Sequence, residues 1–212
     1  EHGGGNNSTF TVRVTSSSET DTYSSIAAGI GSLKGPLHGG ANLQVVDMLE
    51  HLKEAISDWT DAAELDAYLQ KMLNKEVYNK TGKIYGIGHA VYTLSDPRAV
   101  ELKRLAGELA KEKGREDEYN FLKLIEQEGI KCLQEHRGGS KPACANLDFY
   151  SGFIYEMIGL PQEIYTPIFA MARIVGWTAH RIEELNFEGR RIIRPAYKNI
   201  LGELDYTPLS ER

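Results

Sequence analysis

The sequence has few cysteines and no long apolar run. Its 212 residues include two cysteines, Cys132 and Cys144, which provide neither a disulfide framework nor a pair with zinc-ligand spacing. We expect two buried free thiols, which fit a reducing cytosol, and predict a cytoplasmic location. No stretch reaches the ~18 consecutive apolar residues of a membrane span, and the polar, glycine-rich residues 1–7 lack a signal-peptide pattern. These absences exclude a disulfide-rich secreted domain and a membrane-spanning helix.

An excess of positive charge is also missing. The chain has 24 Lys and Arg against 30 Asp and Glu, a net charge of −6. Such a surface does not attract nucleic acid or an anionic membrane, so neither is expected as a partner. Any anionic ligand must be held by a local group of basic residues. The six histidines include no H-x-x-x-H pair, and we predict no metal site.

Two glycine-rich segments lack the residues that nucleotide-binding loops require. After Gly86-Ile87-Gly88, Val91 stands where the third glycine of G-x-G-x-x-G belongs, and no βαβ pattern surrounds it. Residues 35–40 have the glycine spacing of a P-loop, but Ala41 and Asn42 replace its Lys and Ser/Thr. Both nucleotide-binding interpretations are therefore excluded.

Apolar residues at spacings of three and four run along most of the chain, the pattern of amphipathic helices. Residues 7–18 are compatible with helix or strand, and no repeat or convincing hairpin is present. We predict an all-α fold. Capping and stop signals place the helices at residues 23–34 after Asp21, 41–57, about 61–73 after Thr60 or Asp61, 97–113, 116–135, 143–158 and 164–185. The helix over 97–113 carries Val100, Leu102, Leu105 and Leu109.

Three irregular segments carry groups suited to chemistry. Residues 82–98 combine three glycines with His89, which can exchange a proton near neutral pH, and Arg98, whose planar fork suits a carboxylate. Residues 35–42 place His38 between glycines just before a helix, and residues 145–150 place Asp148 at a helix beginning. Histidines flanked by glycines in loops are good candidates for a site.

In this order, the three segments closely resemble the citrate synthase family, and the resemblance covers essentially the whole chain. Its most distinctive part is Gly86-Ile87-Gly88-His89 followed by Asp96-Pro97-Arg98. The resemblance implies a small helical domain at residues 40–152. It also implies that residues 1–39 and 153–212 are segments of a large helical domain, the second one with a C-terminal tail.

The resemblance further implies an acyltransferase that condenses acetyl-CoA with oxaloacetate and then hydrolyses the citryl thioester. Asp148 matches the base that removes the methyl proton, and His38 matches the donor to the thioester oxygen. His89 matches the group that polarises the ketone of oxaloacetate. Coenzyme A enters as a co-substrate, and no permanently bound cofactor is expected.

Further positions follow from the same resemblance. His2 matches another histidine on oxaloacetate, and Arg98, Arg173 and Arg194 match arginines that hold its carboxylates. Arg194 matches the arginine that reaches the partner subunit's site, so a homodimer is expected. Backbone groups along residues 37–39 and 84–88 are the expected coenzyme A contacts, namely Leu37, Gly39, Ile84, Gly86 and Gly88.

Structural alternatives remain for several of these residues. Asp148 could simply cap its helix, and Arg173, in an apolar helix, could belong to a buried ion pair. Arg98 could be an exposed first-turn residue and Arg194 a solvated member of a basic tail. Packing or surface roles suffice for His51, His136 and His180.

Two other functions also remain open. One is a 2-methylcitrate synthase that uses propionyl-CoA, and the other is a non-catalytic module that binds a carboxylate or coenzyme A. The chain has no initiator Met and begins within functional sequence, so we expect a fragment that lacks the N-terminal part of the family. Such a polypeptide should be weakly active or inactive by itself.

Overall fold

The computed structural model describes residues 5–139, 142–198, 200, 202–203 and 205–212. Within these residues the regular elements are helices, which confirms the all-α prediction. One isolated β-bridge also pairs Ile87 with Ala145. In chain order they are α1 (Asn7–Ser16), α2 (Thr22–Leu33), α3 (Ala41–Ala55), α4 (Ala62–Leu73), α5 (Pro97–Lys113), α6 (Glu116–His136), α7 (Leu147–Met157), η1 (Gln162–Ile164), α8 (Tyr165–Asn186) and η2 (Leu209–Glu211).

Side-chain caps explain the starts of four of the eight α-helices in the described residues. The carboxylates of Asp21, Asp61 and Asp96 accept backbone N–H groups in the first turns of α2, α4 and α5, as their sequence positions predict. Gly114 ends α5 with a φ of 68°, a left-handed conformation that suits glycine. The helix predicted from residue 143 begins instead at Leu147, because residues 143–145 are not helical and Asn146 is the cap.

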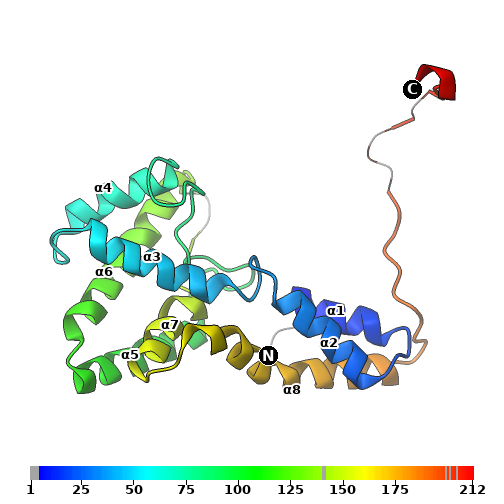
Figure 1. Ribbon diagram of the computed structural model, residues 1–212, viewed down its shortest axis with the longest axis horizontal. Coiled ribbons are helices and arrows are strands. Elements are labelled where there is room, and N and C mark those ends of the chain that lie inside the picture. The colour runs from blue at the N-terminus through cyan, green and yellow to red at the C-terminus, as the bar shows by residue number, and fades with distance from the viewer. Residues whose placement is uncertain (1–4, 140–141, 199, 201, 204) are drawn as a thin grey trace.

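The helices pack around two separate apolar clusters. One joins α3, α4, α6 and α7 with parts of α5 and includes the fully buried Phe121, Phe149 and Tyr150. The other joins α1, α2 and α8 around Val12, Leu33 and Trp177. Figure 1 shows these two groups at opposite ends of an elongated molecule, with a tail that extends away from α8. The predicted domain division at residues 40 and 152 stays a prediction, and the first cluster continues to Met157.

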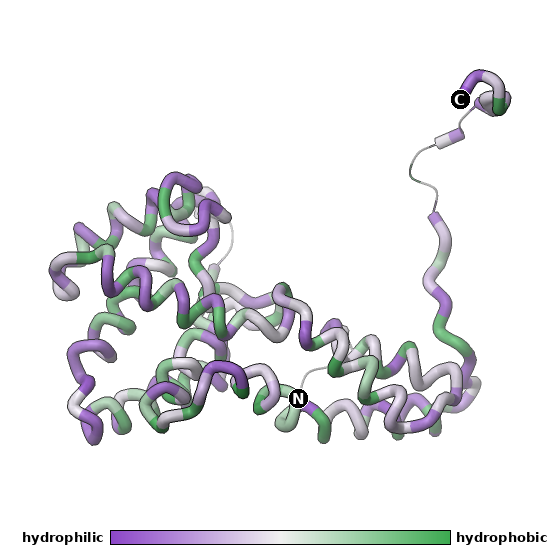
Figure 2. The backbone as a smooth tube through the Cα atoms, viewed as in Figure 1, coloured by the Kyte–Doolittle hydropathy of each residue, from purple (hydrophilic) through white to green (hydrophobic). Residues whose placement is uncertain are grey.

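Helix α8 buries one face and exposes another apolar face. Arg173 and Trp177 are buried among α1, α2 and α8, whereas Met171, Val175 and Ile182 are 70%, 74% and 62% exposed. Figure 2 shows hydrophobic and hydrophilic residues alternating along the helices, as amphipathic packing requires. No helix in the described part of the chain combines the length and apolarity that crossing a membrane would need.

Candidate active site

Two of the three motif segments are joined by backbone pairing. The Gly88 N–H donates to the Cys144 carbonyl at 2.7 Å, and the Asn146 N–H donates to the Gly86 carbonyl at 2.9 Å, on either side of the Ile87–Ala145 bridge. Gly86 and Gly88 have φ values of 79° and 102°, which other residues adopt only with strain. The pairing holds the loop that carries His89 against the start of α7.

His89 is held in one neutral tautomer. Its Nδ1 accepts the backbone N–H groups of Val91 at 3.0 Å and Tyr92 at 3.2 Å, so the proton of the neutral ring lies on Nε2. Burial, and then the positive charge of Arg98, lower the pKa of His89, although Asp96 acts in the opposite direction. A neutral imidazole with a fixed Nε2–H can donate a hydrogen bond to a carbonyl oxygen.

Arg98 is oriented by a buried carboxylate. Its Nε and Nη2 donate to the two oxygens of Asp96 at 2.9 and 2.8 Å, and Asp96 is 1% exposed. The guanidinium also lies over the ring of Tyr92, 5.2 Å from its centroid. The alternative of an exposed first-turn arginine is therefore wrong, since Arg98 is half-buried and held on two sides.

Asp148 is not the cap of α7. The cap is Asn146, whose side-chain oxygen accepts the Asp148 N–H at 2.9 Å, and this leaves the Asp148 carboxyl available for another task. Protein atoms surround that carboxyl closely although part of the residue stays accessible, and this burial raises the pKa of Asp148 to about 6. Arg98 and Arg173 lower the pKa and Asp96 raises it, so Asp148 lies within electrostatic reach of both arginines.

Arg173 comes from α8 and is 5% exposed. Its Nη1 donates to the side-chain oxygens of Asn6 at 2.8 Å and Ser8 at 3.5 Å, and its guanidinium lies over Phe169. Arg98 and Arg173 line one cavity of about 430 Å³. The remaining residues around this cavity are Tyr92, Leu147, Tyr155, Ile168, Phe169 and Ala172. Two guanidinium groups at one cavity suit a ligand with two carboxylates.

His38 adopts the opposite tautomer to His89. Its Nε2 lies 3.3 Å from the backbone N–H of Ser8, which donates to it, and 2.9 Å from the Ser8 hydroxyl. The ring proton is therefore on Nδ1. Gly39 next to it could not carry a side chain, because a Cβ there would lie 2.2 Å from the Leu33 carbonyl oxygen. Ser8 contacts both His38 and Arg173, and Asn6 contacts Arg173. The sequence motifs revealed none of these contacts.

The predicted coenzyme A contacts differ in their surroundings. Leu37 is 90% exposed, and the missing side chain of Gly88 would meet no atom within 4 Å. Ile84 points into the first cluster, and a Cβ on Gly86 would lie 2.8 Å from Phe149, so these two residues could reach a ligand through backbone groups alone. All five contacts, including Gly39, stay predictions.

Arg194 is not brought to this cavity. It is exposed in the chain after α8, beside a separate cavity of about 320 Å³ that Arg13, Glu184 and Phe187 also line. His2 lies outside the described residues. Among the residues that are described, no three His, Cys, Asp or Glu side chains are grouped in a way that could hold a metal ion.

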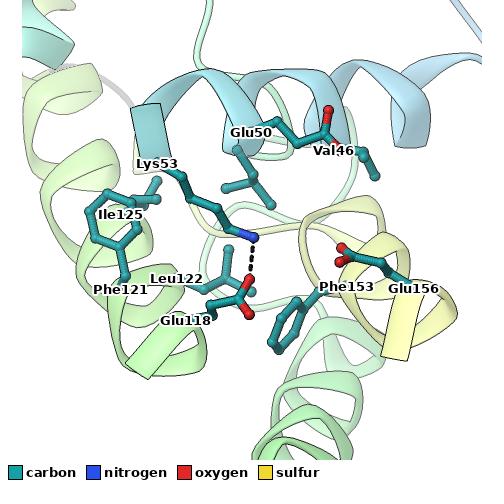
Figure 3. A pocket seen from close by; sticks show the side chains of 10 residues that line it. Val46, Glu50, Lys53, Glu118, Phe121, Leu122, Ile125, Phe153 and Glu156 are labelled. Carbon is teal, nitrogen blue, oxygen red and sulfur yellow. Dashed lines mark hydrogen bonds and ion pairs between the residues drawn. The ribbon is translucent and has the colours of Figure 1, made fainter. Parts of the chain in front are cut away.

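A further cavity lies between α3, α6 and α7, away from the motif residues (Figure 3). Its floor is apolar, with Phe121, Leu122 and Phe153, and Lys53 of α3 forms an ion pair with Glu118 of α6 across its rim. We interpret it as a structural junction inside the first helix group, because none of the predicted site residues lines it.

Comparison with known proteins identifies the family. Residues 1–196 match the family model described as citrate synthase, C-terminal domain. The chain belongs to the citrate synthase family. The citrate synthase of Synechocystis sp. is 39% identical over 210 residues, which is 98% of this chain and 48% of that protein. A 2-methylcitrate synthase of Corynebacterium glutamicum is also 39% identical, with 98% and 49% covered.

A solved family structure has the same fold. The citrate synthase of the archaeon Thermoplasma acidophilum, in a ternary complex with carboxymethyl coenzyme A and oxaloacetate, superposes with a TM-score of 0.74 at 34% identity. The comparison covers 97% of this chain and 50% of that one. This member of the citrate synthase family thus spans about half the length of the relatives it matches.

Proposed function

We propose that this chain supplies the catalytic groups of a citrate synthase, which forms citrate and coenzyme A from acetyl-CoA, oxaloacetate and water. The observation that carries the proposal is the cavity shared by Arg98 and Arg173, with the carboxyl of Asp148 in electrostatic reach of both. The Thermoplasma relative was solved with oxaloacetate and a coenzyme A analogue, which supports the same ligand classes here.

The first step is the binding and activation of oxaloacetate. Its two carboxylates pair with Arg98 and Arg173, and its ketone oxygen accepts the Nε2–H of His89. Because burial lowers the pKa of His89 and favours its neutral form, His89 polarises the ketone by hydrogen bonding and does not bring a positive charge into the site. The ketone carbon becomes more electrophilic as a result.

The second step joins the two substrates. Asp148 removes a proton from the methyl group of acetyl-CoA, while the Nδ1–H of His38 donates to the thioester oxygen on which negative charge develops. The resulting carbon nucleophile attacks the ketone carbon, and the new alkoxide takes up the proton that Asp148 removed, so that the Asp148 carboxylate is ionised again. Water then hydrolyses the citryl thioester, which releases citrate and the coenzyme A thiol.

The active species in this proposal is larger than the described chain. We call it the assembled enzyme: this chain together with the half of the family's length that it does not span, as a homodimer in the cytoplasm. The exposed apolar face of α8 (Met171, Val175, Ile182) gives that additional half a surface to cover. Arg194, remote from the cavity of Arg98 and Arg173 in its own chain, would complete the oxaloacetate site of the second copy. His2 would be a further histidine that binds oxaloacetate.

The 2-methylcitrate synthase of Corynebacterium glutamicum is as similar to this chain as the Synechocystis citrate synthase, so propionyl-CoA is the second candidate substrate. Release of the coenzyme A thiol with acetyl-CoA and with propionyl-CoA tests both. We expect kcat/KM to favour acetyl-CoA. A preference for propionyl-CoA would establish the second candidate, and no turnover by the assembled enzyme with either would leave a binding module.

A further inference from the structure

Asn146 connects the two segments that carry His89 and Asp148. Its side-chain oxygen accepts the backbone N–H of Asp148 at 2.9 Å, and its side-chain Nδ2 donates to the carbonyl of Gly88 at 2.9 Å. Its own backbone N–H donates to the Gly86 carbonyl, also at 2.9 Å. One residue thus binds the first turn of α7 and the peptide unit that leads into His89.

The cap alone does not explain an asparagine here. Asp, Ser and Thr cap helices about as well as Asn, but Asn combines an acceptor with N–H donors and carries no charge. The other described helices with a side-chain cap, α2, α4 and α5, use the aspartates Asp21, Asp61 and Asp96. Helix α7, which carries the proposed base, is the one capped by an uncharged residue, and the side chain of this residue also has a hydrogen-bond donor.

The backbone at Gly88, which Asn146 binds, depends on hydrogen bonds for its position. Gly88 has a φ of 102°, and the space where a side chain would stand is open, so side-chain packing does not fix this peptide. The Gly88 N–H donates to the Cys144 carbonyl, and the Gly88 carbonyl accepts the side-chain N–H of Asn146. Without the hydrogen bond from Asn146, the peptide unit between Gly88 and His89 would lose the contact that holds its carbonyl.

We propose that Asn146 is a positioning residue, which fixes the distance between the ketone-polarising His89 and the base Asp148 and avoids a further carboxylate, besides Asp96, next to Asp148. This inference rests on the proposed function, because it uses the roles assigned to those two residues. Asn146 itself is not assigned a contact with substrate. Its effect is exerted on geometry and charge.

Two substitutions in the assembled enzyme separate these two effects. Asn146→Ser keeps an uncharged capping oxygen and loses the donor to Gly88, whereas Asn146→Asp keeps the cap, loses the donor and adds a charge. Both should lower kcat by roughly 10- to 100-fold, the scale of a displacement near 1 Å. The oxaloacetate Kd should stay within about threefold, because Arg98 and Arg173 remain in place.

The pH profile distinguishes positioning from a general loss of structure. The acid limb of kcat/KM should keep its midpoint in Asn146→Ser and move to higher pH in Asn146→Asp, because a neighbouring carboxylate disfavours ionisation of Asp148. Asp61→Ser, a cap replacement remote from the site, is the matched control and should change thermal stability as much as Asn146→Ser does without lowering kcat.

Three results would overturn the inference. They are a kcat of Asn146→Ser within twofold of wild type, an equal loss of kcat in Asp61→Ser, and an acid limb that does not move in Asn146→Asp. Asp148→Asn, measured in parallel, keeps this failure distinct from failure of the proposed function. If Asp148→Asn is inactive while Asn146→Ser is fully active, the positioning role alone is wrong. If Asp148→Asn is active, the proposed function is wrong.

Discussion

The backbone N–H of Ser8 donates to Nε2 of His38 at 3.3 Å, and this contact makes His38 the tautomeric opposite of His89. His38 offers Nδ1–H and His89 offers Nε2–H, each fixed by backbone amides. Two neutral histidines can then act as hydrogen-bond donors toward two different carbonyl groups, one on each substrate.

The tautomers can be observed directly. In the chain labelled with ¹⁵N-histidine at pH 7.5, two-bond ¹H–¹⁵N correlations should show a protonated Nδ1 for His38 and a protonated Nε2 for His89. His38→Gln and His89→Gln assign the signals, and the exposed His136 serves as the internal reference. The same tautomer in both rings would contradict the assigned roles.

Arg98 should be essential for dicarboxylate binding. Arg98→Ala removes a charge-assisted pair with the substrate and leaves the buried Asp96 without its guanidinium, so oxaloacetate affinity should fall roughly 10- to 100-fold. Calorimetric titration of the assembled enzyme without acetyl-CoA measures it. Arg104→Ala on the exposed side of the same helix, where Arg104 pairs with Glu101 and Glu108, is the control. Equal oxaloacetate affinities for the two variants would show that Arg98 does not bind oxaloacetate.

Gly86 and Gly88 should respond differently to a methyl group. At Gly86 a Cβ would lie 2.8 Å from Phe149 and 3.0 Å from Val45, at a φ of 79°, so Gly86→Ala combines overpacking with backbone strain. We expect it to lower the free energy of unfolding by about 2–4 kcal/mol, and Gly88→Ala, whose surroundings are open, by about 1–2 kcal/mol. Urea denaturation of both variants measures the difference, and an equal or larger cost at Gly88 would contradict it.

The ion pairs beside the cavity of Figure 3 should make stability depend on acid pH. Hydrogen bonds from Arg115, opposed by burial and assisted by Lys53, lower the pKa of Glu118 from 4.5 to about 2. A carboxylate whose pKa is lower in the folded state stabilises the fold above its unfolded pKa, and that stability is lost as pH falls from about 4.5 toward 2.

Glu118→Gln should therefore flatten the decline in the free energy of unfolding between pH 6 and 3. Urea denaturation at several pH values gives the slope, with exposed Glu112→Gln as the matched control. Parallel curves for wild type and Glu118→Gln would show that the network contributes nothing to the pH dependence.

Local signals in the sequence predicted the helices well, and side-chain burial less well. Asp21, Asp61 and Asp96 mark helix starts because a cap is a contact between near neighbours. On α5 the apolar pattern includes Val100 and Leu105, yet both are exposed and the buried face consists of Ala99, Ala106 and Ala110. At Gly107 of α5 a Cβ would lie 2.9 Å from Tyr119 of α6, so that position also has no room for a larger residue, and periodicity cannot reveal such close packing.

Motifs in the sequence indicate candidate site residues, whereas contacts between distant segments leave no such signal. His38, His89, Arg98 and Asp148 belong to recognisable blocks. Ser8 lies in a run of polar residues with no motif, and its contact with His38 spans thirty positions of the chain. From the sequence alone, Asp148 is an alternative cap of α7. Asn146 is the cap because residues 144–146 pair with residues 86–88, which excludes a helix before Asn146. This pairing is a long-range backbone contact that local sequence signals do not reveal.

The proposed mechanism depends on Asp148 acting as the base. The pH dependence of kcat/KM for acetyl-CoA, measured in the assembled enzyme with and without Asp148→Asn, tests this role. Since a base must be ionised and the pKa of Asp148 is about 6, log(kcat/KM) should rise with unit slope below about pH 6 and level off above it. Asp148→Asn should lose roughly 1000-fold or more in kcat/KM while it still binds oxaloacetate. An Asp148→Asn variant that retains a tenth of the activity, or a wild-type profile without a break near pH 6, would show that Asp148 is not the base.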